Sequence, residues 1–439
     1  MDSEPVNSLN ILMICYYYPP LLDVGCKRSV AFSKYFKKYG WTPYVLSVKN
    51  PDRTYCSIGS DAPPQGVHTE YSYSIINMYK FLGKLNGLCS RILKLFGVQV
   101  KRNYFYDIFC IPDLFWGWIP LATIDGARII RNKHIDIIYV SCSPFSATLV
   151  GICLKFITRK PLIIDFRDVY ALEVESIKHA LPRPAFRKRI DTWFEAKASK
   201  WADLFIVTTK EMKVLYAQTY TQMAAKIFTV HNGFESKDLP TNATSLRYAK
   251  FTIAYAGNFY FEAVGREIFF EALALLQDKG KIDKSNFQFL YYGAWSEYIR
   301  TISKDFHVED IVIANPDISH EKLLAAIKRA HLQLLKIIKP MISTKLFEGI
   351  ALNIPLLAII PTGEVEEIIK EYSPSSYVVT EQSSEKIADA ILDAMDRYEK
   401  NAIQDNNVSE FLERFSRENL ALKLINIIED KIPLRRRTS

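Results

Sequence analysis

Two charged residues, Lys345 and Glu348, lie close together in the segment STKLFEGIALNIP and are of the types that can hold a nucleotide. Ser343 or Thr344 can cap a short helix that we expect to end before Pro355. Lys345 then lies in the first turn, where free backbone N–H groups and the helix dipole attract a phosphate. Glu348 follows one turn after Thr344, and its carboxylate can accept hydrogen bonds from both hydroxyls of a ribose. The alternative, an ordinary solvated helix end, stays open on these residues alone.

Glycines and basic residues also follow other apolar segments. In YYYPPLLDVGCKRS, Gly25 permits a close approach of the backbone to a ligand, and Arg28 lies where the next helix is expected to begin. In YAGNFY, Gly257 and Asn258 follow a second apolar segment, and Arg266 lies in the first turn of a later helix. Neither loop has the GxxxxGK[ST] or GxGxxG pattern, so a P-loop and a nicotinamide cofactor are disfavoured.

The segment DFRD offers a second kind of chemistry through Asp165, Arg167 and Asp168. These residues can orient an acceptor or supply a general base, with Asp168 as the group in contact. Alternatively, Arg167 neutralises both acids in an internal ion-pair network, and the sequence leaves both interpretations open. Asp113 in IPD is more typical of a turn or a helix cap, and His320 in SHEK of a capping turn.

These residues need strands and helices that place them at one edge of a sheet. Short apolar segments alternate with amphipathic helical segments in both halves of the chain, and continuous apolar runs are typical of strands buried on both faces of a parallel sheet. The pattern predicts an α/β fold with two Rossmann-like, doubly wound parallel-sheet domains. The expected strands are residues 11–15, 44–48, 136–141, 161–166, 204–209 and 227–231 in the first half, and 251–257, 287–293, 310–314, 332–337 and 355–360 in the second.

A polar, proline-containing segment, SKDLPTNATS at residues 236–245, separates the two groups of strands. We therefore expect an N-terminal domain at residues 1–240 and a C-terminal domain at residues 241–408. A ligand is expected at the carboxyl ends of the strands, in the cleft between the domains. Residues 409–439 are predicted to form a helix over 409–432 that packs back on the domains, followed by a basic tail.

Composition predicts a globular protein of two or three domains without a spanning helix. The 439 residues are 49% hydrophobic and 24% charged, and they contain no run of about 20 apolar residues. The N-terminal segment MDSEPVNSLN is acidic and polar, unlike a secretory signal. Seven scattered cysteines without a CxxC pair argue against a disulfide framework or a zinc site, and they favour a cytoplasmic location.

The net charge of +8 is divided unevenly. Residues 1–240 carry a net +11 and residues 241–439 a net −3, so the first half should face an anionic partner. Nucleic acid is disfavoured, because no zinc finger, RNP-like motif or interleaved basic–aromatic stripe occurs. Residues 75–102 contain six basic residues, no acid and an apolar stripe. This segment predicts either an interfacial helix on an anionic inner membrane surface or a surface helix whose stripe packs on the domain.

Short segments, in order along nearly the whole chain, resemble those of GT-B glycosyltransferases. The resemblance is to the retaining group 1 (family 4-like) glycosyltransferases that build bacterial surface polysaccharides. It is carried by YYYPPLLDVGCKRS, IPDLFWGWIPLA, VSCSPFSATLVG, PLIIDFRDVY, WADLFIVTT, VHNGFE, YAGNFY, DISHEKL and STKLFEGIALNIPLLAIIPTGEV. It implies transfer of a sugar from a nucleotide-diphosphate sugar to a hydroxyl of a lipid-linked saccharide acceptor, with the anomeric configuration retained and without a metal or other cofactor.

The resemblance implies that residues 1–240 form the acceptor side and that residues 241–408 bind the nucleotide sugar. It also implies roles for individual residues. Lys345 and Arg266 neutralise the diphosphate, Glu348 holds the ribose, and the turn around Ser319 lines the base. Asp168 and Lys345 are the implied catalytic residues. The implied nucleotide-sugar site comprises Gly25, Arg28, Gly257, Asn258, Arg266, Ser319, Thr344, Lys345, Leu346 and Glu348.

The chain departs from the family pattern at two positions. Pro340 replaces the first acid of the paired-glutamate motif, which often contacts the transferred sugar, and Val24 precedes Gly25 where many relatives have two glycines. A nucleotide-sugar epimerase of the same fold and a non-catalytic GT-B partner protein therefore remain alternatives. We expect a cytoplasmic protein that is peripheral on the inner face of the membrane and has no nucleic acid partner.

Overall fold

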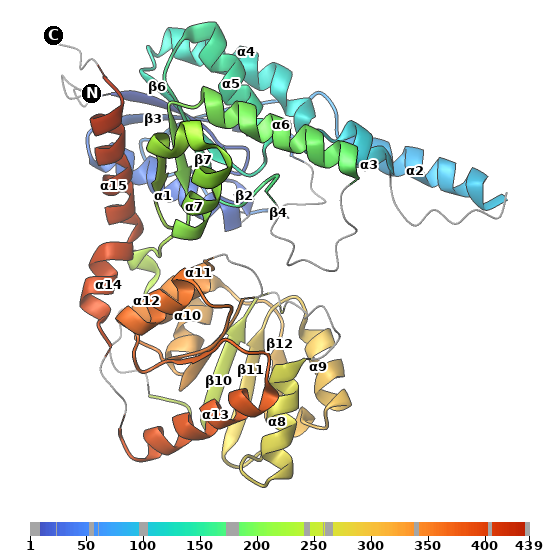
Figure 1. Ribbon diagram of the computed structural model, residues 1–439, viewed down its shortest axis with the longest axis vertical. Coiled ribbons are helices and arrows are strands. Elements are labelled where there is room, and N and C mark those ends of the chain that lie inside the picture. Colours follow the sequence, from blue (N-terminus) through green and yellow to red (C-terminus); the bar gives the residue numbers. More distant parts are fainter. Residues whose placement is uncertain are drawn as a thin grey trace. The chain divides into compact units, whose positions relative to one another are not determined.

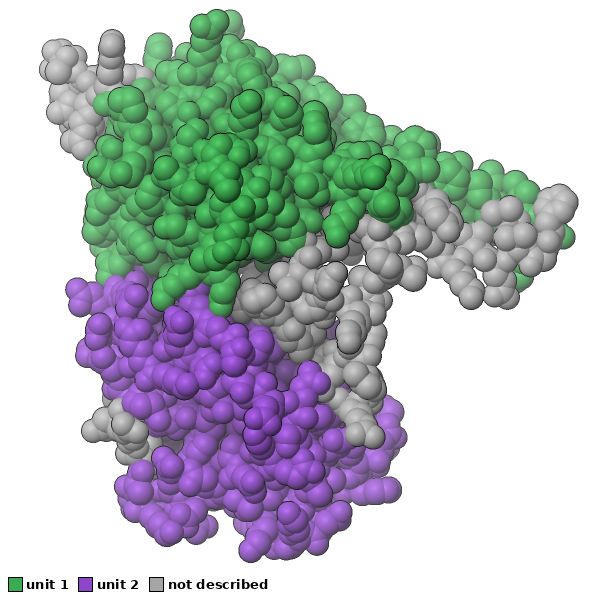
Figure 2. Space-filling view, viewed as in Figure 1, with its two compact units in different colours: residues 1–173, 181–231, 417–439 green, residues 174–180, 232–416 purple. Residues whose placement is uncertain are grey.

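The computed structural model describes residues 9–22, 24–51, 57–59, 61–95, 104–172, 184–240, 246–257, 259, 267–337, 342–402 and 406–434. The chain divides into two compact units, which Figure 2 shows in different colours. Unit 1 contains residues 1–173, 181–231 and 417–439, and unit 2 contains residues 174–180 and 232–416. Each unit is built on its own parallel sheet with helices on both faces, which confirms the predicted fold class.

The sheet of unit 1 has seven parallel strands in the order β5-β3-β1-β6-β7-β8-β9. Along its central strand, Ile11 and Met13 face one apolar core, and Leu12 and Ile14 face another. Burial on both faces explains why these strands read as uninterrupted apolar runs. The strands are β1 (Asn10–Ile14), β3 (Thr42–Val48), β5 (His68–Ser72), β6 (Ile137–Cys142), β7 (Leu162–Phe166), β8 (Leu204–Val207) and β9 (Ile227–Thr229), with a small antiparallel pair β2 (Leu21–Leu22) and β4 (Ser57–Ile58) beside them.

Helices cover both faces of this sheet (Figure 1). Helices α1 (Val24–Lys38) and α15 (Arg417–Lys431) supply side chains to one core, and helices α4 to α7 supply side chains to the other. The remaining elements of unit 1 are α2 (Met78–Leu95), α3 (Tyr104–Phe109), η1 (Trp116–Trp118), α4 (Ile119–Asn132), α5 (Ser146–Thr158), α6 (Ala185–Trp201), α7 (Lys210–Thr219) and η2 (Thr221–Lys226).

Unit 2 has a six-stranded parallel sheet in the order β12-β11-β10-β13-β14-β15. Helices α8, α9 and α13 pack on one face, and α10, α11, α12 and α14 contribute to the cores on the other. The strands are β10 (Phe251–Ala256), β11 (Phe287–Tyr292), β12 (Val312–Asn315), β13 (Leu332–Lys336), β14 (Leu356–Ile359) and β15 (Tyr377–Val379). The helices are η3 (Ser236–Asp238), α8 (Ile268–Asp278), α9 (Ser296–Asp305), η4 (Glu309–Ile311), α10 (His320–Lys328), α11 (Thr344–Ala351), α12 (Glu364–Tyr372), α13 (Ser384–Glu399) and α14 (Val408–Phe415).

The single helix expected over residues 409–432 is two helices, because Ser416 adopts an extended conformation with φ −62° and ψ 141°. Ser416 forms an isolated parallel bridge with Phe234, at the start of unit 2. On either side of this break the apolar residues serve different cores: Phe411 of α14 lies in the core of unit 2, and Leu424 of α15 lies in the core of unit 1. The chain passes from unit 1 to unit 2 between residues 231 and 232. This point precedes the segment 236–245, where the sequence predicts the domain boundary.

Helix α2 extends away from the sheet of unit 1 (Figure 1). Only its beginning packs: Leu82 is buried in a small cluster, whereas Leu88, Ile92 and Leu95 are 57%, 48% and 85% exposed. One of the two interpretations required the apolar stripe to pack on the domain. In the structure the stripe does not pack along the length of the helix. Among the described residues, no helix is long and apolar enough to span a bilayer.

Candidate functional site

The short helix α11 begins as the sequence predicts, with Ser343 as its N-cap. The Ser343 hydroxyl accepts a hydrogen bond from the backbone N–H of Lys345, with a distance of 3.3 Å between the two atoms. Leu346, Phe347 and Ile350 anchor the helix, because all three are fully buried in the core of unit 2. The cap and this apolar face together fix the direction in which Lys345 leaves the first turn.

Lys345 reaches from α11 to the carboxyl end of the neighbouring strand β10. Its ammonium nitrogen lies 2.9 Å from the Tyr255 hydroxyl oxygen and 4.3 Å from the centre of the Tyr255 ring. A Cβ atom placed on Gly257 would be 3.4 Å from the same ammonium. Gly257 has φ +89°, a conformation that favours glycine, so the turn after β10 keeps backbone and ammonium close together. The structure thus brings Lys345 and Gly257, two predicted site residues, side by side.

The electrostatic environment of Lys345 favours an incoming anion. Burial lowers the pKa of its ammonium from 10.5 to about 8, and the negative charge of Glu348 opposes this shift only in part. Among the described residues, no carboxylate lies within ion-pair distance of Lys345. A cation held at the positive end of a helix dipole is a site for phosphate.

Glu348 lies one turn further along α11 and meets the beginning of helix α10. Its carboxylate oxygen Oε1 is 3.3 Å from Nε2 of His320, which is 3.8 Å from a carboxylate oxygen of Asp238. Ser319 is at the N-cap position of α10 but makes no side-chain cap hydrogen bond. The predicted base-lining turn and the predicted ribose carboxylate are therefore neighbours in space. His320 is part of this cluster in addition to opening the helix.

Several predicted residues lie elsewhere or have other tasks. Asn258 and Arg266, like Pro340, lie outside the described residues. Thr344 is the half-buried first residue of α11. The side chain of Leu346 is buried in the core, and its backbone N–H donates to the Ser343 carbonyl at 3.1 Å, so Leu346 is a packing residue of α11.

The prediction that Arg28 contacts the donor is wrong. Arg28 is 3% exposed and holds Asp165 through two hydrogen bonds, from Nε at 2.7 Å and from Nη2 at 3.1 Å. Its Nη1 donates to the backbone carbonyl of His231 at 2.5 Å. With all three guanidinium nitrogens engaged inside unit 1, Arg28 has a structural role.

The remaining predicted residues of unit 1 are Gly25 and Asp168. Gly25 is a buried residue in the first turn of α1, which begins three residues before the position expected from the sequence. Asp168 is exposed after β7. One interpretation required Arg167 to neutralise Asp165 and Asp168, and the structure does not show these ion pairs. Arg167 donates instead to the backbone carbonyls of Cys142 and Ser143, each at 2.8 Å.

The expectation that Asp113 is a cap is confirmed. Its carboxylate accepts hydrogen bonds from the backbone N–H of Ser146, at 2.8 Å, and from that of Phe115, at 2.9 Å. Ser146 is the first residue of α5, so Asp113 satisfies the beginning of that helix. Burial raises the pKa of Asp113, and the hydrogen bonds from Ser146 act in the opposite direction.

Sequence reasoning missed three residues at this edge of unit 2. Tyr255, which holds Lys345, reads as one more apolar residue of a strand. Lys336, at the end of β13, is 4% exposed and forms a 2.8 Å ion pair with Glu267, which is 2% exposed. A lone lysine in the apolar segment LQLLKI was the available signal for this pair. His320 was recognised only as a capping residue.

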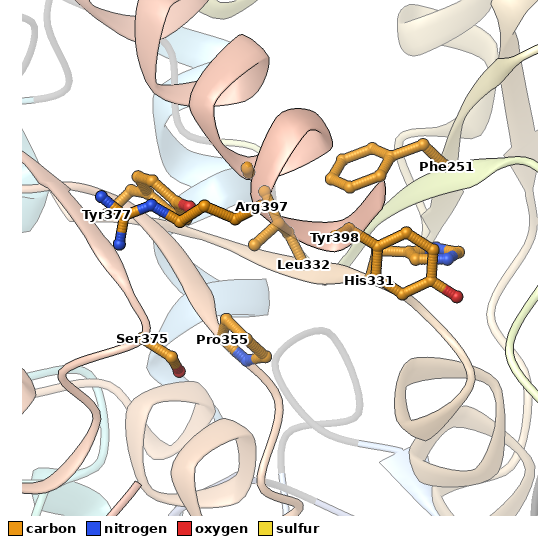
Figure 3. A pocket seen from close by; sticks show the side chains of 9 residues that line it. Phe251, His331, Leu332, Pro355, Ser375, Tyr377, Arg397 and Tyr398 are labelled. Atoms are coloured by element: carbon orange, nitrogen blue, oxygen red, sulfur yellow. The ribbon is translucent and has the colours of Figure 1, made fainter. Parts of the chain in front are cut away.

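A pocket in unit 2 lies at the opposite edge of the sheet, at the amino ends of the strands (Figure 3). His331 lies within it, and its Nδ1 accepts a hydrogen bond from the backbone N–H of Thr252 at 3.0 Å. Burial lowers the pKa of His331 to about 4. This pocket is remote from Lys345 and does not form part of the candidate site. Its lining residues are Phe251, His331, Leu332, Pro355, Ser375, Tyr377, Ala394, Arg397 and Tyr398.

Two protein families match the chain, one in each half. The model of Glycosyltransferase Family 4 matches residues 95–237, and the model of Glycosyl transferases group 1 matches residues 242–411. A comparison with curated proteins gives no significant match. Within the described residues, no group of three or more His, Cys, Asp and Glu side chains is placed to hold a metal ion.

Solved structures share the fold over nearly the whole chain. The structure of Anabaena HepE in complex with UDP and glucose has 14% identity and a TM-score of 0.64, over 96% of this chain and 100% of that one. A glycosyltransferase from Rickettsia africae has 14% identity and a TM-score of 0.64, over 97% and 99%. Sucrose-phosphate synthase from Thermosynechococcus elongatus has 14% identity and a TM-score of 0.61, over 96% and 98%. With the two family matches, this likeness makes the chain a glycosyltransferase of the GT-B fold.

Proposed function

We propose that this GT-B glycosyltransferase transfers a sugar from a nucleotide-diphosphate sugar to a hydroxyl of a saccharide acceptor, with retention of the anomeric configuration, in the synthesis of a surface polysaccharide. One observation carries the proposal. The Lys345 ammonium lies at the N-terminus of α11 and beside Gly257, at the carboxyl end of a central parallel strand. Ligands of open α/β sheets bind at this edge, so the diphosphate of the donor has a positively charged place to bind.

The same groups account for catalysis of sugar transfer. Negative charge develops on the leaving diphosphate as its bond to the sugar breaks. The Lys345 ammonium and the positive end of the α11 dipole are positioned to stabilise that charge, and loss of one such donor as the ammonium typically costs about 3–4 kcal/mol of transition-state stabilisation. We propose that these groups make a metal ion unnecessary for departure of the diphosphate, and that the reaction uses no other cofactor.

The nucleoside is assigned to the neighbouring cluster. Glu348 lies one turn after the first turn of α11, within reach of the turn that carries Ser319 and His320. We assign the ribose hydroxyls to Glu348 and the base to the Ser319 turn. Because the structure of Anabaena HepE contains UDP, UDP is the first nucleotide to test, followed by GDP and ADP.

Nucleotide binding tests the proposal directly. Isothermal titration calorimetry with UDP, GDP and ADP should show binding of at least one of them. Lys345→Ala should abolish or strongly weaken this binding, and Glu348→Ala should weaken it measurably. Lys386→Ala is the matched control: Lys386 also lies in the first turn of a helix of unit 2, but it is exposed and paired with Glu381. Undiminished binding in the Lys345 variant would contradict the assigned site.

Product analysis tests the reaction. Incubation with a nucleotide sugar and a saccharide acceptor should give a glycoside, and proton NMR of that product should show the anomeric configuration of the donor. Free sugar and nucleotide without a glycoside would support the epimerase alternative instead. An inverted product would refute retention but not transfer.

We further propose that the acceptor is lipid-linked and that the protein is peripheral on the cytoplasmic face of an anionic membrane. Helix α2 supports this proposal, because it presents Leu88, Ile92 and Leu95 to solvent next to the basic residues Lys84 and Arg91 and contains no acidic residue. Exposed apolar side chains flanked by cations are typical of interfacial helices. Flotation with vesicles that contain anionic lipid should recover the protein, and equal recovery without anionic lipid would remove the electrostatic part of the proposal.

A further inference from the structure

One imidazole nitrogen of His320, Nε2, faces two carboxylates that come from separate elements of unit 2. Its Nε2 is 3.3 Å from Oε1 of Glu348, on α11, and 3.8 Å from Oδ2 of Asp238, in η3. The three side chains are 31%, 14% and 32% exposed, so the cluster lies at the surface with Glu348 as its most enclosed member. No part of the proposed function so far assigns a task to this imidazole.

We propose that His320 is a positioning residue for Glu348 and determines how well the site recognises the ribose of a nucleoside diphosphate. The inference rests on the proposed function, because it takes Glu348 as the group that accepts the ribose hydroxyls. An Nε2–H donated to Oε1 holds the carboxylate in one rotamer. The carboxylate held in this way presents its oxygens to the ribose hydroxyls as hydrogen-bond acceptors.

The place of His320 in the fold supports this role. A glutamate side chain that no neighbour holds loses side-chain entropy, up to about 2 kcal/mol, when a ligand fixes it. A partner that fixes the carboxylate beforehand reduces that loss. The imidazole is itself restrained, because His320 opens α10 and its Nε2 also faces Oδ2 of Asp238 at 3.8 Å.

A purely structural role makes a different prediction. If His320 only neutralised Glu348 and Asp238, its loss would alter the stability of the protein. It would weaken the binding of all nucleotides to the same extent, or of none. If His320 instead positions Glu348, its loss weakens the binding of only those ligands that carry ribose hydroxyls. The two roles are therefore separated by nucleotides that lack those hydroxyls.

The experiment measures dissociation constants by calorimetry for the tightest of UDP, GDP and ADP, for the 2′,3′-dideoxy form of that nucleotide, and for inorganic pyrophosphate. His320→Ala should raise the dissociation constant of the ribonucleotide about three- to tenfold, as expected for one lost hydrogen bond. It should leave the dideoxy nucleotide and pyrophosphate unchanged. His320→Gln, whose side-chain amide also offers an N–H, should restore most of the affinity, whereas the shorter His320→Asn should not.

A double-mutant cycle with Glu348→Ala completes the test. In that background, His320→Ala should have no further effect, because the carboxylate that it positions is gone. Equal ribonucleotide affinity of wild type and His320→Ala, or an equal loss for the dideoxy nucleotide, would overturn the inference while the proposed function stands. If wild type binds none of the three nucleotides, the proposed function itself fails. If His320→Ala does not fold, the comparison of His320→Gln with His320→Asn decides.

Discussion

Replacement of Lys345 by methionine should make the donor-free protein more stable while it destroys the proposed phosphate site. The pKa of Lys345 falls from 10.5 to about 8 because the ammonium is buried. This difference corresponds to about 3 kcal/mol against the charged form in the folded protein. Methionine keeps the apolar stem and removes the charge. It also removes the hydrogen bond to Tyr255, which is worth about 1 kcal/mol.

The free energy of unfolding at pH 7 should therefore rise by about 1–3 kcal/mol in Lys345→Met. The sign follows from the direction of the pKa shift. The folded-state pKa lies below the unfolded-state value, so the unfolded chain binds more protons between about pH 8 and 10.5, and wild-type stability gains with rising pH in that window. The advantage of Lys345→Met should be complete below pH 8 and should shrink as the pH rises toward 10.5.

Urea unfolding of both proteins without nucleotide, at pH 7 and at pH 9.5, measures this difference. Lys336→Met is the contrasting control, because Lys336 is a buried lysine of unit 2 that is paired with Glu267 at 2.8 Å. Its loss leaves a buried carboxylate without its cation, so it should destabilise the protein by about 3–5 kcal/mol. If Lys345→Met is less stable than wild type at pH 7, or if its advantage does not depend on pH, the electrostatic argument for the site is refuted.

Three further predictions address other parts of the molecule. At pH 8, where about half of the Lys345 side chains are neutral, nucleoside diphosphate binding should take up close to half a proton; calorimetry in buffers of different ionisation enthalpy measures this, and no buffer dependence would contradict it. Arg28→Met should lower the free energy of unfolding by about 3–5 kcal/mol, because Asp165 would stay buried without its cation. Arg28→Met should leave the UDP affinity unchanged. A selective loss of that affinity would show that Arg28 contacts the donor, as the sequence predicted. Leu88→Glu with Ile92→Glu should reduce recovery with anionic vesicles without altering the unfolding midpoint, since both side chains are half exposed; unchanged recovery would exclude α2 as the contact.

The architecture was accessible from sequence because its signal is local. Continuous apolar runs locate eleven of the strands within about two residues of their observed bounds, since burial on both faces demands such runs. Strands β5 and β15 of the two parallel sheets were missed, as was the short antiparallel pair β2 and β4. Both β5 and β15 lie at sheet edges, and β5 reads HTEYS, without an apolar run. The break at Ser416 was missed for another reason: the helical pattern continues across it, and only the two different cores require a change of direction.

The candidate site was predictable where charge and turn chemistry coincide in a short segment. Lys345 and Gly257 both follow apolar strands, and the parallel sheet brings the ends of such strands together. Arg28 was misassigned because its partner Asp165 lies 137 residues away along the chain. A sequence shows that an arginine stands near a helix start, but it does not show that a carboxylate from another strand already occupies the guanidinium. Partners of this kind become visible only in the fold.

The return of the last helix to unit 1 sets an order for completing the two units during synthesis. Residues 232–416 are contiguous and carry the sheet of unit 2 together with Lys345, Glu348 and His320. Unit 1, whose strands leave the ribosome first, lacks Leu420, Leu424 and Ile428 of one of its cores until the final stretch of chain has been made. A gene cut between the units should therefore yield a self-sufficient C-terminal fragment and an N-terminal fragment whose sheet face is covered by α1 but not by α15.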